Sequence, residues 1–423
     1  MLRAFKNDWA LFTGILMLVA SASLLTTLLT IRGATIGFST AQIGLIQAAC
    51  PVGALLGSMY APRLVTNVGH VRSFGALASM CSTAAVVHLM TNDPWVWGAM
   101  RFLAGLCFPG LFVIAESWLN AKAENRSRAG LLAIYFVTTT LGNAIGPYLA
   151  GIPDSEGTNL FALSSILISL CLVPLLISRN PAPEIVDSER MPFRRFMRVS
   201  PMALIGVLIS GAIASTFSVA MPLYGLRLGM DSADATRLLV IAAVAGALAQ
   251  FPIAWASDHM DRRLVVAISA IFGAVICLFS AAGIFDGAWV GVRVGLIAAA
   301  FLPMYSLCAA HANDQLTPNQ MIAASGTLVF TYNLGVAFGS FSGPSMIGAL
   351  GPQGFMVLLA TLSAMMAALA IIRRQSSAAP TDTGRAHPVH PGAQVVAVMG
   401  EAADAILPDA EVPAEDGAEP ASV

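Results

Sequence analysis

Long apolar runs, separated by short polar breaks, make up most of the chain. The breaks contain Gly, Pro, Asn, Asp or clustered charges, which is the composition of short loops. A helix crosses a bilayer with about 20 residues and satisfies its own backbone hydrogen bonds, so the pattern predicts an all-α integral membrane protein. We predict twelve transmembrane helices, at residues 9–31, 40–61, 74–90, 95–119, 130–150, 160–177, 201–224, 235–256, 264–285, 289–310, 320–348 and 355–372.

The first apolar run shares two features with secretory signal peptides. Arg3 and Lys6 precede it, and the small residues at 20–22 resemble a cleavage site. The run continues to Ile31, however, and is therefore long enough to cross a bilayer. We expect it to be retained as the first transmembrane helix.

Composition supports a lipid environment. The 423 residues are 57% hydrophobic and 11% charged, whereas soluble domains carry about 25% charged residues. The formal net charge of −1 argues against a nucleic-acid partner. All six cysteines fall within apolar runs and none forms a Cys-x-x-Cys spacing, so we expect neither a metal site nor a cofactor.

The positions of the basic residues predict the orientation in the membrane. With twelve spans, seventeen lysines and arginines fall in the tails, loops and linker of one side, against Arg32, Arg227 and Arg237 on the other. Basic residues concentrate on the cytoplasmic side of membrane proteins. We therefore predict that both termini are cytoplasmic.

Two breaks in the apolar pattern divide the chain into four regions. A polar linker, 179–200, separates an N-terminal six-helix bundle, 1–178, from a C-terminal six-helix bundle, 201–374. Residues 375–423 hold eight acidic residues and one arginine and have little apolar surface, so we expect a disordered, acidic cytoplasmic tail.

The two predicted bundles resemble each other at an offset of about 192 residues. Arg101 in the fourth span corresponds to Arg293 in the tenth, and the segment LGNAIG at 141–146 corresponds to LGVAFG at 334–339. Because each repeat has an even number of spans, the repeats are parallel and related by an axis along the membrane normal. That arrangement is typical of transporters in which two bundles rock around a central site.

Four segments resemble signature motifs of the major facilitator superfamily, over roughly residues 5 to 374. The family's loop motif Gly-x-Leu-x-Asp-Arg-x-Gly-Arg-Arg is matched weakly by PRLVTNVGHVR at 62–72, where Thr66 replaces the acid. AWASDHMDRR at 254–263 is the closer copy. RFLAG at 101–105 and GNAIGP at 142–147 resemble the family's Arg-x-x-x-Gly and antiporter-associated Gly-x-x-x-Gly-Pro motifs. The chain looks most like the bacterial YcaD-like branch, which implies the major facilitator fold and a bacterial inner-membrane location.

Two arginines lie inside predicted spans. A charge at the depth of Arg101 costs roughly 3 kcal/mol to insert, so it should face protein or water rather than lipid. Arg101 is either a group that binds substrate or modulates proton coupling, as the resemblance favours, or a structural hydrogen-bonding residue. Arg293 lies nearer the end of its span, and we expect its side chain to reach the membrane interface.

A cytoplasmic gate is predicted from charges near the ends of spans. Glu116 is expected to pair with Arg128, Arg262 or Arg263 and to hold the two bundles together in the outward-open state; the alternative is that it carries a proton. Asp258 is expected to cap the start of the fifth span near Ser127. His311 is expected at the edge of a loop.

Small and polar residues within the spans complete the candidate site. We expect the small residues and prolines of the paired motifs to allow close packing and bending of helices. These are Gly105, Gly142, Gly146, Pro147, Gly339, Gly343 and Pro344. The polar side chains that we expect to contact substrate or assist coupling, together with Arg101, are Asn143, Tyr305, Tyr332 and Asn333.

The sequence therefore favours a proton-linked secondary transporter, most simply a monomeric exporter of a small solute. A passive facilitator or a solute exchanger stays open, because no predicted span carries an unpaired acid at mid-membrane. A transporter-like membrane sensor or scaffold that signals through its acidic tail is a further alternative. No P-loop and no catalytic motif of the common hydrolases is present, so neither ATP-driven pumping nor an enzyme is expected.

Overall fold

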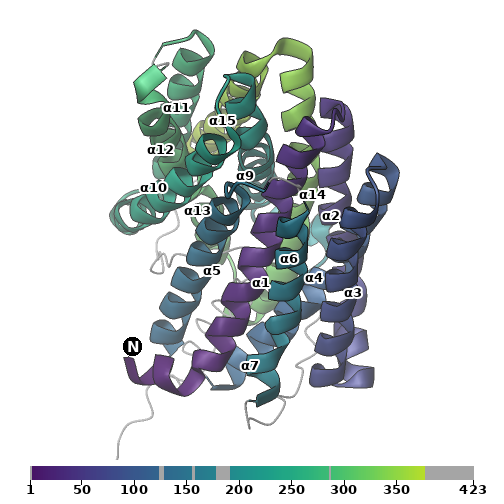
Figure 1. The fold of residues 1–423 in the computed structure, drawn as a ribbon. Coiled ribbons are helices and arrows are strands. Elements are labelled where there is room, and N and C mark those ends of the chain that lie inside the picture. The colour runs from purple at the N-terminus through teal and green to yellow at the C-terminus, as the bar shows by residue number, and fades with distance from the viewer. Residues whose placement is uncertain (1, 123–127, 155–157, 178–190, 285–286, 377–423) are drawn as a thin grey trace, which may run out of the picture.

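Helices account for nearly all of the structure, which is a computed structural model (Figure 1). It describes residues 2–122, 128–154, 158–177, 191–284 and 287–376. The predicted acidic tail and most of the predicted linker lie outside these residues. Each predicted span coincides with a helix or with two consecutive helices.

The helices of the first half are α1 (Leu2–Thr35), α2 (Thr40–Val68), α3 (His70–Met90), α4 (Pro94–Lys122), α5 (Arg128–Ala150), α6 (Asn159–Leu170) and α7 (Leu172–Ile177). A short helix, α8 (Phe193–Val199), precedes the second half. The second half contains α9 (Pro201–Arg227), α10 (Ser232–His259), α11 (Arg262–Ala281), the 3-10 turn η1 (Gly287–Trp289), α12 (Val290–Phe301), α13 (Met304–Asn313), α14 (Pro318–Leu350) and α15 (Pro352–Ser376).

Polar residues cap the starts of α2, α10 and α11. The Ser39 hydroxyl accepts a hydrogen bond from the Gln42 amide, and the Gln42 side chain accepts one from the Ser39 amide. Asp231 and Asp261 accept amide hydrogen bonds at the starts of α10 and α11. These caps satisfy amides that have no partner within the helix, which fixes where each helix begins.

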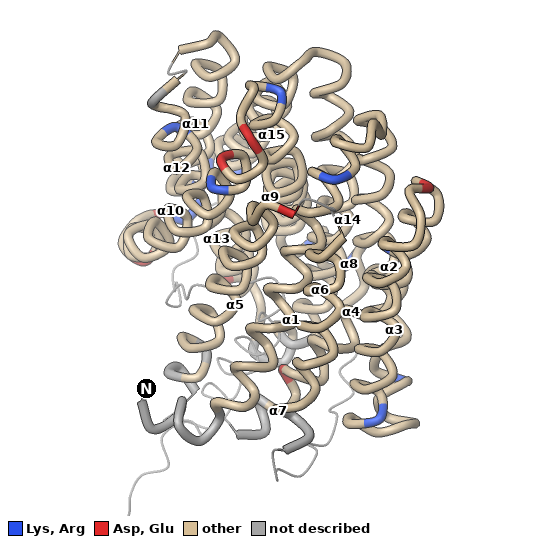
Figure 2. Tube along the Cα trace, in the orientation of Figure 1, with Lys and Arg blue, Asp and Glu red and all other residues tan. Residues whose placement is uncertain are grey.

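The helices have the length and polarity of membrane spans. Among the described residues, nine helical segments are long and apolar enough to cross a bilayer. The three other predicted spans correspond to α5, to α6 with α7, and to α14. On α10, Val244, Leu248, Phe251 and Trp255 form an exposed apolar stripe at helical spacing, and Trp255 is 65% exposed. Exposed stripes of this kind suit contact with lipid tails rather than water. Figure 2 shows long stretches of the trace without charged residues.

Each cluster of buried apolar residues belongs to one half of the protein. One cluster of buried residues lies between Met191 and Ala370, and two others contain only residues between Leu11 and Cys171. Figure 1 shows α10, α11 and α12 gathered away from α3 and α7. The main packing between the halves pairs α2 with α14, α5 with α10 and α1 with α9.

Close contacts between the halves lie at the ends of the helices opposite those at which α1 begins and α15 ends; we call this the distal side and the other the proximal side. Gly44 of α2 lies against the backbone of Phe341 of α14. Gly348 of α14 lies against Thr40 of α2, and Gly151 lies against the start of α10. Any side chain at these glycines would meet the facing helix, so the halves are tightly packed on the distal side.

Candidate functional site

A buried polar network surrounds Arg101 where α1, α2 and α4 meet. Arg101 is 4% exposed, and its Nη2 donates to Thr26 Oγ1 at 3.2 Å and to Gln47 Oε1 at 3.1 Å. Gln47 Nε2 donates in turn to the Thr26 carbonyl oxygen at 2.7 Å and to Thr30 Oγ1 at 2.9 Å. Arg101 therefore joins three helices, and its Nε has no acceptor among the described residues.

Arg293 occupies the matching place in the second half, and the prediction that it reaches the membrane interface is wrong. It is 2% exposed, and its Nη2 donates to the Tyr224 hydroxyl of α9 at 2.6 Å. Its guanidinium carbon also lies 5.8 Å from the centre of the Tyr224 ring. A tyrosine supplies both an acceptor and an aromatic face, so a charge can be accommodated inside the bundle without reaching water.

Glu116 is buried within the first half, at 5% exposure. Its Oε1 accepts a hydrogen bond from the Tyr135 hydroxyl of α5 at 2.9 Å. The structure does not bring Glu116 together with Arg262 or Arg263 in this arrangement. The side chain of Arg128 lies outside the described residues, so the predicted Glu116–Arg128 pair stays a prediction.

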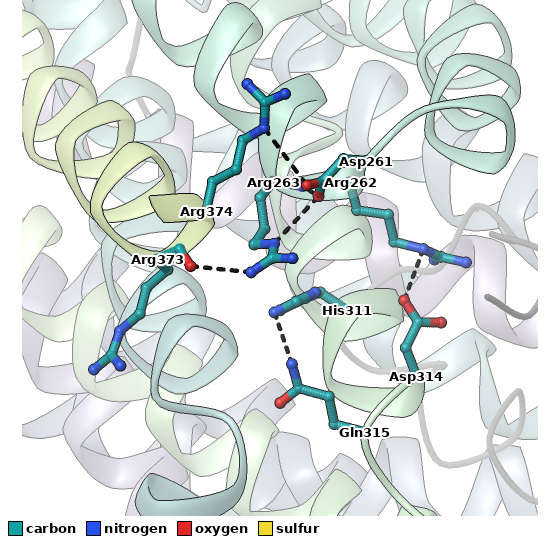
Figure 3. Close-up of polar contacts among 8 residues, drawn as sticks. All are labelled: Asp261, Arg262, Arg263, His311, Asp314, Gln315, Arg373 and Arg374. Atoms are coloured by element: carbon teal, nitrogen blue, oxygen red, sulfur yellow. Dashed lines mark hydrogen bonds and ion pairs between the residues drawn. The ribbon is translucent and has the colours of Figure 1, made fainter. Parts of the chain in front are cut away.

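Arg262 and Arg263 contact groups of their own half at the proximal side (Figure 3). Arg262 Nε lies 2.9 Å from Asp314 Oδ2, and both side chains are almost fully buried. Arg263 donates to Asp261 Oδ1 at 3.2 Å and to the Arg373 carbonyl oxygen at 3.0 Å. The predicted gate is a feature of the outward-open state. Here the halves meet on the distal side, so these arginines tie α11 to α13 and α15 instead.

Two other predictions concern the proximal side. Asp258 is exposed near the end of α10, and its expected neighbour Ser127 lies outside the described residues. His311 was expected at a loop edge and lies in the last turn of α13, but its side chain is buried, and its Nε2 lies 3.1 Å from Gln315 Nε2.

The predicted polar contacts are only partly gathered together. The rings of Tyr305 and Tyr332 meet edge to face, with centroids 4.9 Å apart. Asn333 Nδ2 donates to the Val329 carbonyl oxygen of its own helix at 2.9 Å. Asn143 belongs to the other half and accepts a hydrogen bond through its backbone oxygen from Ser23. The two tyrosines contact each other, and the asparagines lie on separate helices.

The predicted packing glycines all face a neighbouring helix of the same half. Gly105 of α4 meets the backbone of Cys50 in α2. On α5, Gly142 and Gly146 face α1, and on α14, Gly339 and Gly343 face α9. The prolines of the same motifs, Pro147 and Pro344, lie inside α5 and α14. The paired motifs thus occupy equivalent places in the two halves.

Comparison with known proteins identifies the family. The family model for the Major Facilitator Superfamily matches residues 11–312 and again 203–403. The chain belongs to the major facilitator superfamily. The second match begins about 192 residues after the first, which is the offset between the two similar halves of the sequence.

Curated relatives place this superfamily member beside bacterial transporters. It is 27% identical over 346 residues to the MFS-type transporter YcaD of Salmonella arizonae, which covers 80% of this chain and 87% of the relative. An MFS-type transporter of Yersinia pestis is 26% identical over the same shares of both chains. These matches confirm the predicted resemblance to the YcaD-like branch.

Solved structures confirm the major facilitator fold. The nucleoside transporter NupG superposes with a TM-score of 0.71 over 86% of this chain and 98% of its own, at 13% identity. A bacterial homologue of the human lysosomal transporter Spinster gives 0.70, and a D-xylose-proton symporter gives 0.67. Membership of the superfamily, shown by the family model and the curated relatives, makes the chain a multi-pass membrane transporter and not an enzyme.

Three residues of the site in this superfamily member were not predicted from the sequence. Gln47, Tyr135 and Tyr224 are the hydrogen-bond partners of Arg101, Glu116 and Arg293. Each is a single polar residue in an apolar run. Such a residue signals a buried contact, but its partner is on another helix and is found only once the helices are packed.

Proposed function

We propose that the chain is a secondary active transporter that exports a small solute by alternating access, in exchange for protons. It acts as a monomer in a bacterial plasma membrane, with both termini and the proximal side in the cytoplasm. In the arrangement described here it is closed on the distal, extracytoplasmic side.

The packing between the halves is the observation that carries this proposal. Contacts such as Gly44 with Phe341 and Gly348 with Thr40 join the halves on the distal side. On the proximal side, Glu116, Arg262 and Arg263 bind groups of their own half. These contacts within each half can persist when the proximal ends separate, so none of these buried ions loses the partner named here.

Two buried groups support coupling and recognition. Glu116 has a neutral hydroxyl as its partner among the described residues, and uptake of a proton is the simplest way to neutralise a buried carboxylate without a cation. The GNAIGP segment resembles the motif associated with antiporters. Arg101 keeps a buried donor, Nε, which suits a solute with a carboxylate or another anionic oxygen.

The contact between Tyr305 and Tyr332 supports an amphipathic solute. The Tyr305–Tyr332 pair presents apolar ring faces with hydroxyl groups at their edges. Such a surface binds an apolar body and still offers hydrogen bonds. We therefore propose amphipathic, weakly anionic compounds as the substrate class.

Flux in proteoliposomes tests the proposal. The purified chain is reconstituted with pyranine trapped inside, and a panel of amphipathic organic acids is added with and without an imposed pH gradient. An exchanger of solute for protons changes the internal pH when a substrate is added, and the gradient accelerates solute movement. Flux that ignores the gradient would identify a facilitator instead. Failure of every compound to move, together with signalling that needs residues 375–423, would favour the sensor.

A further inference from the structure

A small cavity lies on the proximal side of the second half, beside Arg263 and His311 and apart from the polar network of Arg101. Its volume is about 60 Å³, whereas one buried water needs only about 10–15 Å³. It therefore has room for a tetrahedral oxyanion. The residues that line it are Val199, Ser200, Pro201, Met202, Arg263, His311, Gln315 and Arg373.

The start of α9 forms one wall of the cavity and carries an unused donor. Ser200 precedes the 27-residue helix α9 but does not cap it with its side chain. It is 0% exposed, and its hydroxyl has no hydrogen-bond partner among the described residues. A buried hydroxyl without a partner is costly, and the start of a long helix attracts an anion; here Pro201 has no amide, so the amides of Met202 and Ala203 are the donors at that end. Both features therefore favour an anion in this cavity.

Cations on two other helices face the same space. Arg263, the second residue of α11, is held in place by Asp261 and by the Arg373 carbonyl oxygen (Figure 3). Arg373 contributes a second positive charge at the end of α15. Asp261 offsets part of this charge, but it also contacts Arg374, which does not line the cavity. The walls therefore remain positive overall.

The helix next to the cavity has the pattern of a helix that lies on a membrane surface. α8 ends at Val199, directly before Ser200. It buries Phe196 in the core and exposes Arg194, Arg195 and Arg198. Basic residues beside a basic pocket at the cytoplasmic surface are typical of sites for anionic lipid headgroups.

We propose that this cavity binds a phosphate group, donated either by the headgroup of an anionic phospholipid in the cytoplasmic leaflet or by free inorganic phosphate. The Ser200 hydroxyl and the amides of Met202 and Ala203, which follow the proline that begins α9, donate hydrogen bonds to the phosphate oxygens, and Arg263 and Arg373 neutralise their charge. The bound phosphate joins the ends of α9, α11 and α15.

Thermal unfolding of the purified full chain in detergent tests the site. The probes are inorganic phosphate, dioctanoyl phosphatidylglycerol, and dioctanoylglycerol, which has the same acyl chains without a phosphate. The variants are Ser200→Ala and Arg373→Gln, with Arg374→Gln as the matched control because it removes the same charge one residue outside the cavity. Ser200→Ala removes a hydroxyl that has no partner in the described structure, so it leaves the fold intact.

We expect phosphatidylglycerol to raise the unfolding temperature of the wild-type protein, and dioctanoylglycerol to leave it unchanged. A rise with inorganic phosphate as well identifies phosphate itself as sufficient; a rise with the lipid alone identifies a headgroup site. Ser200→Ala and Arg373→Gln should each weaken the apparent affinity about tenfold, as loss of one hydrogen bond to a charged group predicts, and Arg374→Gln should not. The proposal is overturned if neither phosphate probe shifts the wild type, or if both cavity variants respond as the wild type does.

Discussion

Replacing Arg101 with Met removes a charged donor that joins α4 to α1 and α2. Met keeps an apolar side chain of similar length, so Arg101→Met loses the charge and the hydrogen bonds while most of the packing is kept. Gln47 Oε1, in a side chain that is 1% exposed, then loses its donor. We expect a less stable protein, and flux that is lost even at temperatures where it remains folded.

The size of the effect follows from the two hydrogen bonds of Arg101 Nη2. A bond to a charged group contributes about 1.5–3 kcal/mol in soluble proteins, but bonds between membrane helices average about 0.6 kcal/mol and reach about 1.7 kcal/mol. The membrane values apply because the unfolded helices also remain in an apolar solvent. Arg101→Met should therefore lower the free energy of unfolding by about 1–3 kcal/mol, of which about 1 kcal/mol is coupling to Gln47.

A double-mutant cycle measures that coupling. The free energy of unfolding in mixed micelles is determined for the wild type, Arg101→Met, Gln47→Leu and the double variant. Gln47→Leu removes the orphaned acceptor, so the double variant should be more stable than the sum of the single changes predicts. A coupling energy of zero would refute the network as a stabilising element. Wild-type flux in Arg101→Met would show that Arg101 has no part in transport.

Two further predictions concern packing and coupling. Gly105→Ala places a methyl group against the Cys50 backbone and should lower the free energy of unfolding by about 1–3 kcal/mol, whereas Gly98→Ala, on the same helix with nothing within 4 Å, should not lower it; equal effects would contradict the packing. Glu116→Gln should abolish the acceleration of flux by a pH gradient, while Tyr135→Phe should only weaken it. Acceleration that persists in Glu116→Gln excludes this carboxylate as the proton carrier.

The spans were predictable because the signal is carried by each segment alone. A run long enough to cross the bilayer must form a helix wherever its neighbours lie. The same dependence on single segments explains why breaks of the helix within a span were not predicted. The tenth span was predicted as one helix, but α12 ends at Phe301 and α13 begins at Met304, on either side of Pro303. Proline lacks the amide that would continue the helix, but Pro147 and Pro344 lie inside unbroken helices, so the proline alone did not predict this break.

The site was less predictable because it depends on which face of each helix points inward. Arg101 could be placed inside the protein by the cost of a charge in lipid, and it is buried. The short distance of Arg293 from the end of its span wrongly predicted that its side chain reaches the membrane interface. The Tyr224 hydroxyl accepts a hydrogen bond from its guanidinium inside the bundle instead. Hydrophobicity along one span contains no information about a partner on another, so such pairs required the packed structure.

A reversible cross-link on the distal side tests alternating access most directly. A Cβ built at Gly348 lies 3.2 Å from the Thr40 Cβ, close to the 3.5–4.5 Å found in disulfides, so Thr40→Cys with Gly348→Cys should form a bond after a small adjustment. The controls are the two variants that carry only one of these introduced cysteines. Mass spectrometry of the oxidised chain confirms the link between positions 40 and 348.

The account predicts that oxidation holds the distal ends together and reduces solute flux to the level of protein-free liposomes, and that reductant restores it. In each control with one introduced cysteine, solute flux should be the same before and after oxidation. Wild-type flux through the fully cross-linked protein would contradict alternating access by movement of the two halves.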